Sequence, residues 1–311
     1  MKQIGNVVEK CRNAAGLSRK ELSENICCEK YLYMIEKDQR TPSATVVSLL
    51  GDKMGVDLFE YYEYLECERP IEVKGIMDRF EKYRRETELD RLACANEEAV
   101  LLDDFKREPW KYECELNRLS IKVLKDLEFT EAVGPIQELI EEMEQNKSNN
   151  KCLVNFYILL STCFQMSREI EKAKEVICLA EKAISGKEKI KKYLHIAITL
   201  SINKMTLYYY LGENDKVIEE GMKLHKYEYD TCCQSRSHHT FFYLAFAHYQ
   251  KGHQEIGLEW FTKALCAMLV RKKAADMYFL SRYEMFGVML RDRRIPKELV
   301  EKIKKTYTIE V

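Results

Sequence analysis

The chain has 311 residues, of which 12 are glycine and 5 proline, 46% are hydrophobic and 32% are charged. Glycine and proline are too scarce for a turn-rich β-sandwich, a collagen or a proline-rich disordered chain. Lysine and arginine number 50 against 51 aspartates and glutamates, and the net charge is -1. This balance gives no global attraction to nucleic acid or membranes, so any such site must be local. A chain of this length is expected to fold as more than one unit.

The sequence shows no sign of a targeting or membrane segment. Its first ten residues lack the uninterrupted apolar stretch of a signal peptide, and no run of about 18 apolar residues predicts a transmembrane helix. The 12 cysteines are scattered without a C-x-x-C pair, and several occupy apolar positions of helical patterns. This pattern predicts free thiols in a reducing cytoplasm rather than a disulfide scaffold. We therefore expect a cytoplasmic protein with no membrane partner.

The first 68 residues predict five short helices, each with one apolar face. The first helix stops at Gly16, and a capping box formed by Ser18 and Glu21 opens the second. The fourth is expected to start at Thr41-Pro42, with proline at the first helical position, and Asp57 to cap a fifth over residues 58–62. The predicted inward positions are Ile4, Val8, Cys11, Leu22, Ile26, Leu32, Ile35, Val46, Leu49 and Leu50.

A characteristic order of residues runs through this segment. It comprises Ile4-Gly5, Val8, Arg12, Gly16-Leu17-Ser18, Leu22-Ser23-Glu24-Asn25-Ile26-Cys27, Tyr31-Leu32, Ile35-Glu36 and Arg40-Thr41-Pro42-Ser43. In order and spacing it resembles the XRE/Cro-type helix-turn-helix, and more closely the PlcR-like branch of peptide-responsive regulators. The resemblance covers about 65 residues.

The resemblance implies that the third helix enters the major groove of double-stranded DNA, with its N-terminal residues toward base edges. It places Glu29, Lys30 and Met34 at base edges, and Cys28, Tyr31 and Tyr33 on the same exposed side. Lysine can donate to guanine acceptors and glutamate can accept from cytosine N4. The predicted phosphate contacts are Arg19, Lys37 and Arg40.

The resemblance also assigns Arg12 and Glu36 to an internal ion pair. Lys37-Asp38 stands where the family usually has a glycine in the left-handed conformation, which aspartate tolerates. Residues 1–45 hold eight lysines and arginines against six acidic residues, so local attraction to DNA is weak. The alternative interpretation is an exposed face that is merely solvated.

Beyond Pro70, a charged segment to about residue 86 predicts a linker helix, and the apolar pattern then stays helical. One spacing recurs, with an anchor followed by positions at +3, +4, +7, +16, +20 and +23. The four anchors, Leu116, Tyr157, Ser201 and Phe241, lie 41, 44 and 40 residues apart. Small residues at +4 and +16 predict two helices that approach closely, so each copy predicts a helical hairpin. Residues 75–108 predict an earlier hairpin and residues 274–307 a closing one.

The spacing resembles tetratricopeptide repeats, whose stacked hairpins bury a continuous core and leave a concave face. We therefore expect an all-α fold with a five-helix helix-turn-helix domain (residues 1–68), a linker helix (69–88) and a right-handed tetratricopeptide-like α-solenoid (89–311). Asparagine amides on the concave face can bind the main chain of an extended peptide, while aromatic pockets hold its side chains. Alternatively, the aromatic residues are ordinary repeat packing. The predicted peptide contacts are Asn117, Asn155, Thr162, Gln165, Asn203, Thr206, Tyr209, His239, Phe242, Phe246 and Tyr249.

Two cysteines and two histidines, Cys232-Cys233 and His238-His239, raise the question of a metal site. Their spacing does not match the usual zinc patterns, so the segment is expected to join two hairpins. No nucleotide-binding, zinc-protease or nucleophile-elbow motif occurs in the sequence. We expect neither an enzyme nor a cofactor.

The tandem of a helix-turn-helix and a repeat array resembles the PlcR-like, RRNPP group of cytoplasmic quorum-sensing receptors of Gram-positive bacteria. This resemblance implies a homodimer that reads two half-sites of promoter DNA and binds a short signalling peptide in each array. The alternative is a peptide-independent repressor or adaptor whose array binds another protein. A phosphatase-like effector similar to the Rap branch is disfavoured, because that branch has no helix-turn-helix.

Overall fold

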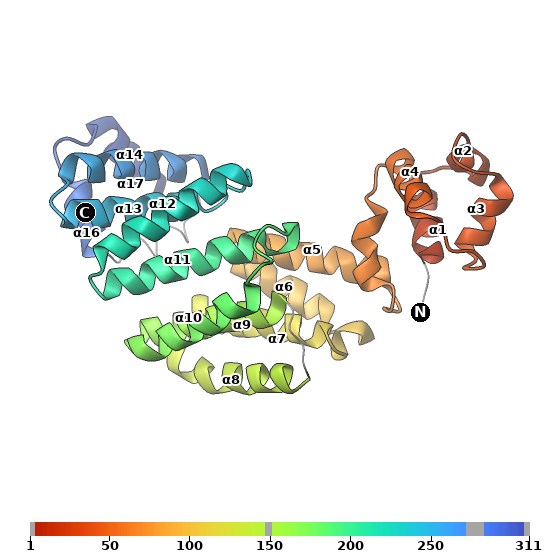
Figure 1. Cartoon of the computed structure of the whole chain (residues 1–311), viewed down its shortest axis with the longest axis horizontal. Helices are drawn as coiled ribbons and strands as arrows, with labels where there is room; N and C mark the ends of the chain where they lie inside the picture. The colour runs from red at the N-terminus through yellow and green to blue at the C-terminus, as the bar shows by residue number, and fades with distance from the viewer. Residues whose placement is uncertain (1–3, 147–150, 272–282, 308–311) are drawn as a thin grey trace. The chain divides into compact units, whose positions relative to one another are not determined.

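The computed structural model describes residues 4–146, 151–271 and 283–307. The chain divides into two compact units, Met1–Asn117 and Arg118–Val311. Within the described residues every regular element is a helix (Figure 1), which confirms the predicted all-α fold class. The division between the units falls inside a helix, and the domain limits proposed above at residues 68 and 88 remain predictions.

The first unit begins with α1 (Gly5–Ala14), α2 (Arg19–Ser23), α3 (Glu29–Glu36), α4 (Ala44–Met54) and the 3₁₀ helix η1 (Leu58–Tyr64). The predicted capping box is present, with Glu21 N donating to Ser18 Oγ at 3.1 Å and Ser18 N donating to Glu21 Oε2 at 2.7 Å. Asp57 caps η1 by accepting from Phe59 N at 2.9 Å. The buried members of their shared core are Ile4, Val7, Val8, Cys11, Leu22, Leu32, Ile35, Val47, Leu50, Met54, Leu58 and Leu65.

Helix α4 differs from its prediction at its start and in its buried face. It begins at Ala44, because Ser43 caps it by accepting from Val46 N at 3.3 Å, so Pro42 lies before the helix and not at its first position. The buried residues follow Val47 at helical spacing, and Leu49 falls outside that stripe with 42% exposure. The prediction of Leu49 as a core residue is wrong.

The first unit continues with α5 (Pro70–Glu86), α6 (Leu89–Ala99), η2 (Asp103–Lys106) and the start of α7 (Trp110–Leu124). Helix α5 packs along α6 and buries Val73, Ile76, Met77 and Phe80, so it is more than a solvated spacer. The buried Asp104 carboxylate accepts from the N–H groups of residues 68 and 69, at 2.9 and 3.1 Å. These bonds satisfy backbone donors at the entry to α5.

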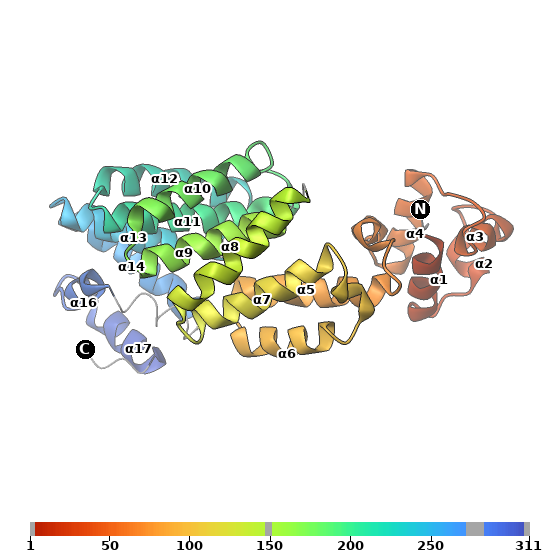
Figure 2. The same cartoon turned by 90° about the horizontal axis from the view of Figure 1, so that it is seen from below.

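The second unit holds the end of α7 and a series of paired helices (Figures 1 and 2). Three of the four predicted repeat hairpins correspond to α9 with α10, α11 with α12, and α13 with α14, and α12 in turn packs on α13. The hairpin predicted from Leu116 spans the division between the two units and remains a prediction. The elements are α8 (Phe129–Gln145), α9 (Lys151–Met166), α10 (Ile170–Ile184), η3 (Lys191–Tyr193), α11 (Leu194–Tyr210), α12 (Asn214–Asp230), α13 (Ser237–Gln250), α14 (Gln254–Arg271), α16 (Glu284–Leu290) and α17 (Lys297–Tyr307).

Small residues at the predicted repeat positions allow the helices to approach. A Cβ on Gly257 would lie 3.0 Å from the carbonyl oxygen of Ala245, so the +16 and +4 positions of the last copy face each other as expected. A Cβ on Gly221 would lie 2.7 Å from Leu244 Cδ2, so this glycine brings one hairpin against the next. The Gly257 contact therefore lies within one hairpin, and the Gly221 contact lies between two neighbouring hairpins.

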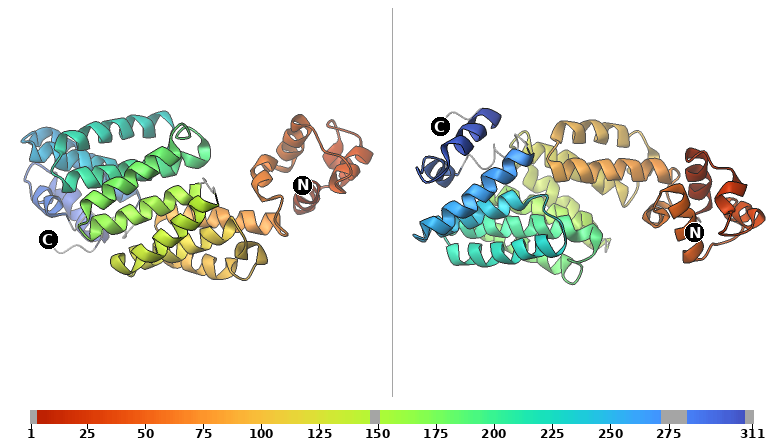
Figure 3. Two further views of the ribbon diagram at one scale, coloured as in Figure 1. Left: turned by 60° about the horizontal axis from the view of Figure 1, so that its bottom comes forward. Right: turned by 90° about the horizontal axis from the view of Figure 1, so that it is seen from above.

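The predicted closing hairpin lies partly outside the described residues. Its last helix, α17, follows Pro296 as expected and packs on α14, with Tyr307 OH donating to the Met268 carbonyl oxygen at 2.6 Å. Figure 3 shows the C-terminal helices in blue at one end of the second unit.

All twelve cysteines are free, in agreement with the sequence-based prediction. Five of them are buried, and burial raises the pKa of the Cys114 and Cys163 thiols to about 12. Such thiols act as small apolar side chains of the core.

Candidate functional site

Helix α3 presents one face to the core and the opposite face to the surface. Leu32 and Ile35 are fully buried. The residues predicted to face DNA bases lie at the other positions of α3 and at its N-cap, and they differ in exposure. Cys28, Glu29, Lys30 and Tyr33 are exposed, whereas Tyr31 and Met34 are half-buried. Cys28, Glu29, Lys30 and Tyr33 are thus accessible at the surface, whereas Tyr31 packs against the core of the domain.

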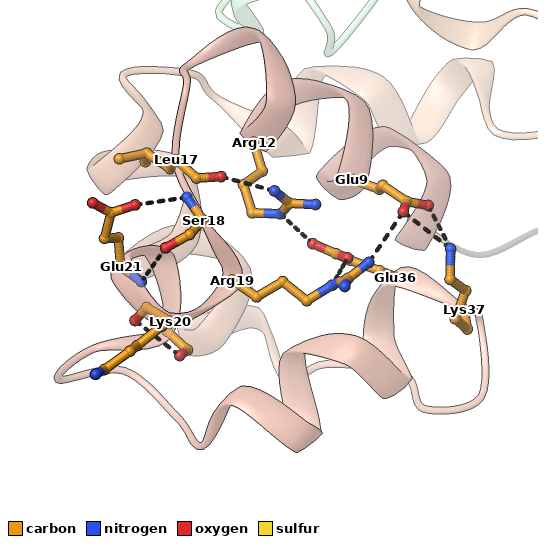
Figure 4. Close-up of polar contacts among 10 residues, drawn as sticks. Glu9, Arg12, Leu17, Ser18, Arg19, Lys20, Glu21, Glu36 and Lys37 are labelled. Atoms are coloured by element: carbon orange, nitrogen blue, oxygen red, sulfur yellow. Dashed lines mark hydrogen bonds and ion pairs between the residues drawn. The ribbon is translucent and has the colours of Figure 1, made fainter.

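One buried carboxylate between two arginines holds α3 in place (Figure 4). Glu36, at the end of α3, is 3% exposed, and its Oε1 and Oε2 accept from Arg12 Nε and Arg19 Nε, both at 2.6 Å. Arg12 also donates from Nη1 to the carbonyl oxygen of Leu17 at 2.7 Å. The predicted ion pair of Arg12 and Glu36 is present, and it ties α3 to α1 and to the turn before α2.

Two of the predicted phosphate contacts have acidic partners inside the domain. Arg19 Nη2 lies 3.3 Å from Glu9 Oε1, and the hydrogen bond from Arg19 to Glu36 raises the pKa of this arginine. Lys37 Nζ donates to both Glu9 oxygens, at 2.9 and 3.0 Å, and lowers the pKa of that carboxyl. Arg40 is exposed and has no ion-pair partner among the described residues. A phosphate would therefore compete with Glu9 for two of these three cations.

The end of α3 is fitted closely to the start of α1. Asp38 adopts the left-handed backbone predicted for this position, with φ of 54°, and its Oδ1 accepts from Gly5 N at 3.0 Å. A Cβ on Gly5 would lie only 2.0 Å from the carbonyl oxygen of Ile35. The glycine is required because the two backbones touch here.

In the second unit, neutral polar side chains connect α9 to α11. Asn203 Oδ1 accepts from Thr162 Oγ1 and from Gln165 Nε2, both at 3.3 Å. Gln165 Nε2 also donates to Ser161 Oγ at 2.9 Å. Thr162 and Asn203 are half-buried. Three of the predicted peptide contacts are thus brought together from two helices.

A second group of hydroxyls and aromatic rings connects α11 to α13. Thr206 Oγ1 lies 2.6 Å from Tyr243 OH, which lies 2.8 Å from Tyr283 OH. The ring of Tyr209 meets that of Tyr283 edge-on, with centres 5.2 Å apart, and that of Phe246 at 5.9 Å. Burial raises the pKa of Tyr243 to about 12, so its hydroxyl keeps its proton at neutral pH.

Sequence reasoning missed Tyr243 and Tyr283. Tyr243 lies two residues after the anchor Phe241, outside the phase assigned to the inner face. The two tyrosines are 40 residues apart, which is the interval between repeat anchors. Polar aromatic residues at the repeat interval were the signal that could have found them.

Four predicted peptide contacts are interior, and placing them on an accessible face is wrong. Phe242 and Phe246 are fully buried in a core with other aromatic rings, because nearly every position of α13 is covered. Gln165 is 2% exposed and uses its amide as described above. Asn117 is fully buried in the first unit, where Arg84 Nη1 donates to its Oδ1 at 3.0 Å.

The three remaining predicted contacts, Asn155, His239 and Tyr249, are half-buried in the second unit. Tyr249 OH donates to Asp292 Oδ2 at 3.2 Å, so this tyrosine joins α13 to the C-terminal segment. The ring of His239 lies 4.2 Å from that of His238. Asn155 lies on α9, and His239 and Tyr249 lie on α13. These are the first helices of the repeats before and after the one whose first helix, α11, carries Asn203 and Thr206.

Residues 8–61 match the helix-turn-helix family. The N-terminal part of the chain is therefore a helix-turn-helix domain of the XRE type, as the motif predicted. No curated protein sequence matches the chain.

Three solved structures are similar to the chain over most of its length. PlcR of Bacillus thuringiensis, in complex with the peptide PapR7 and DNA, has a TM-score of 0.68 at 13% identity, covering 91% of this chain and 100% of PlcR. ComR of S. thermophilus, with DNA and its signalling peptide ComS, has a TM-score of 0.48 at 12% identity, covering 92% and 97%. The SHP pheromone receptor Rgg2 of Streptococcus dysgalactiae has 0.47 at 16% identity, covering 90% and 97%. The likeness to PlcR shows a shared fold.

Two further observations concern the described part of the chain alone. None of its helices combines the length and the apolar composition needed to cross a bilayer. Across residues 4–146, 151–271 and 283–307, no three histidine, cysteine, aspartate or glutamate side chains are grouped to hold a metal ion.

Proposed function

We propose that this protein is a cytoplasmic transcriptional regulator that binds double-stranded promoter DNA as a homodimer through α3. A short signalling peptide, bound by the repeat helices of the second unit, controls its DNA binding. The observation that supports the proposal most is the presence in one chain of a helix-turn-helix domain and the fold of PlcR, which was solved with both a peptide and DNA.

The exposed side of α3 has suitable chemistry for DNA. Lys30 can donate to guanine O6 and N7, and Glu29 can accept from cytosine N4, when the first turn of α3 enters the major groove. Arg40, Lys37 and Arg19 would hold the backbone phosphates and set the register. Because the basic excess of this domain is small, two domains acting together would supply the affinity.

The half-buried polar groups of α9 and α11 have suitable chemistry for a peptide. Asn203 and Thr162 hydrogen-bond to each other at 3.3 Å, and each can exchange that bond for a main-chain group of a ligand. Tyr209 supplies an adjacent aromatic surface. A peptide that binds one arrangement of the hairpins better shifts the population toward it in proportion to its differential affinity.

The decisive experiment uses the purified full chain, promoter fragments from its own genomic neighbourhood and peptides encoded beside it. We expect retention of a specific fragment and a peptide-dependent change in that retention. Failure to bind any fragment, with or without peptide, would refute the proposal. Specific binding that no peptide alters would instead favour a peptide-independent repressor whose repeats bind another protein.

Substitution of Lys30 tests the assignment of α3. Lys30→Ala is expected to reduce discrimination between operator and mutated operator by roughly tenfold to a hundredfold, because one base-reading contact is lost. Peptide affinity should be unchanged. The matched control is Lys226→Ala, which removes an exposed lysine from α12 in the other unit. Equal losses of operator selectivity and peptide affinity would show that the recognition helix is misplaced.

Substitution of the two half-buried asparagines tests the peptide site. Asn203→Ala and Asn155→Ala are each expected to weaken the peptide response by roughly tenfold, through loss of amide hydrogen bonds, without unfolding the chain. Asn13→Ala, at an exposed position of α1, is the control. An unchanged response in both variants would exclude these amides as peptide contacts.

A further inference from the structure

The connection between α12 and α13 places a cysteine beside a histidine at the start of α11. Cys233 Sγ lies 3.4 Å from His195 Nδ1 and 3.9 Å from its Nε2, and His195 is in the first turn of α11. Ser235 Oγ lies 3.5 Å from the same Nδ1. A thiol and a hydroxyl thus converge on one imidazole.

The backbone at the end of α12 explains why this sulfur points inward. Cys232 takes the left-handed conformation, with φ of 52°, and donates from its N–H to the Tyr229 carbonyl oxygen at 3.1 Å. Cys233 N then donates to the Glu228 carbonyl oxygen at 3.0 Å. This pair of bonds is a Schellman motif, in which the second residue past the helix folds back on it. Cys233 consequently packs, half-buried, against the core that contains Ile202 and Met205.

The environment of Cys233 differs from that of three other cysteines in its unit. Cys163 is buried in an apolar core, and burial raises its pKa to about 12, which makes it inert. Cys178 and Cys266 are exposed, and no described histidine lies at hydrogen-bond distance from either sulfur. Cys233 combines partial access with an adjacent imidazole, which is the usual setting of a reactive cysteine.

We propose that Cys233 is a nucleophilic thiol and a site of oxidation by peroxides, with His195 as the group that takes its proton. The sulfur attacks one oxygen of hydrogen peroxide, so that an S–O bond forms and the O–O bond breaks. The thiol proton passes through His195 to the departing hydroxide, which leaves as water. Sulfur is oxidised from thiol to sulfenic acid and the peroxide is reduced, so that RSH + H₂O₂ gives RSOH + H₂O.

This site goes beyond the proposed response to DNA and peptide and does not depend on it. The oxygen added to Cys233 lies against the apolar cluster to which α11 contributes Ile198, Ile202 and Met205, and α11 also carries Asn203 and Thr206. Oxidation would therefore loosen the part of α11 that carries the proposed peptide contacts, since a polar group enters an apolar cluster.

The first test compares cysteines within the reduced full chain. Iodoacetamide is added at pH 7, and alkylation of each cysteine is followed by mass spectrometry of its peptide. We expect Cys233 to react roughly tenfold faster than Cys178 and Cys266, although those two are more exposed. A rate for Cys233 no greater than theirs would overturn the proposal.

The second test separates the role of His195 from simple accessibility. His195→Gln is expected to slow alkylation of Cys233 about tenfold and to abolish its dimedone-trapped sulfenic acid after peroxide treatment, while Cys178 keeps its rate. His253→Gln, at an exposed position before α14, is the matched control. Unchanged reactivity of Cys233 in His195→Gln would refute the assignment.

The pH dependence of alkylation in the wild-type chain tests the role of His195 without a substitution. The alkylation rate of Cys233 should reach its plateau at lower pH than that of Cys178, because the imidazole favours the attacking form of the sulfur. Identical profiles for the two cysteines would overturn the role of His195.

Discussion

Each unit buries a glutamate, and the two carboxyls meet opposite surroundings. Glu36 in the helix-turn-helix domain accepts from two guanidinium groups at 2.6 Å. Glu228 on α12 is fully buried and accepts from the hydroxyl of Thr240 at 3.2 Å. Within the described part of the chain, its other oxygen has no hydrogen-bond partner.

The difference shows two ways of using buried polar groups. Glu36 lies between two guanidinium groups, and the resulting network holds α3 against α1. Burial raises the pKa of Glu228 to about 7, against the lowering effect of the hydrogen bond from Thr240. The helix-turn-helix domain thus places its buried carboxylate between two cations, whereas the second unit pairs Glu228 with a neutral hydroxyl, and its network of Asn203 and Thr162 is neutral as well. Neutral groups can exchange partners with a ligand at smaller cost.

The largest effect is expected from breaking the charged network. Arg12→Ala leaves Glu36 buried with one partner fewer and should destabilise the N-terminal domain by about 3–5 kcal/mol. Hydrogen exchange of the α1 and α3 amides, followed by mass spectrometry, measures the loss. Arg40→Ala is the control and should leave this protection nearly unchanged. A loss under about 1 kcal/mol would show that Arg19 alone compensates the carboxylate.

A pH series tests the other glutamate. The folded pKa of Glu228, about 7, exceeds the ordinary glutamate value of 4.5, so the folded state binds the extra proton between these values. Stability should therefore fall as the pH rises from 4.5 to 7, by about 3 kcal/mol, and then level off. Urea unfolding measures this fall, and Glu228→Gln should remove it.

The control for the pH series is Glu171→Gln, which changes an exposed carboxyl of α10. It should unfold in parallel with the wild type at every pH. If the curve for Glu228→Gln is also parallel to the wild type, Glu228 does not titrate in this range.

The smallest effect is expected in the neutral network. Tyr243→Phe removes the hydroxyl between Thr206 and Tyr283 but keeps the ring, and should lower the unfolding free energy by about 1 kcal/mol. Thermal unfolding measures the change, with Tyr229→Phe at a position 71% exposed as the control. A loss as large as that of Arg12→Ala would contradict the distinction between the two units.

Most of the helix-turn-helix could be predicted because its determinants are local. The capping box at Ser18 and the left-handed position of Asp38 are set by a few neighbouring residues. The start of α4 was predicted wrongly because proline and serine both favour a helix start, and the hydrogen bond from Val46 N to Ser43 decided between them. Leu49 was misassigned because several helical phases fit the apolar pattern of α4.

The repeat hairpins were also predictable, because helix packing imposes small residues at regular intervals. The accessibility of the side chains on them was not. Phe242 and Gln165 have the spacing of an inner face, yet both are interior. Burial depends on which other helices cover a position, and those helices lie about 20 to 40 residues away in the chain, as Phe261 does from Phe242 and Asn203 from Gln165.

The contact between Cys233 and His195 joins residues that are 38 positions apart, and no local motif links them. The sequence by itself determined the helices, their boundaries to within a few residues and the hairpin repeats, because helix signals act over one or two turns and the repeats recur at a regular interval. The Arg12–Glu36 pair was predicted only through the family resemblance. Only the tertiary structure decided which polar groups meet, which carboxyl lies between two cations and which thiol lies beside an imidazole. Those properties depend on distances of a few ångströms between separate helices, and such distances exist only once the helices have packed.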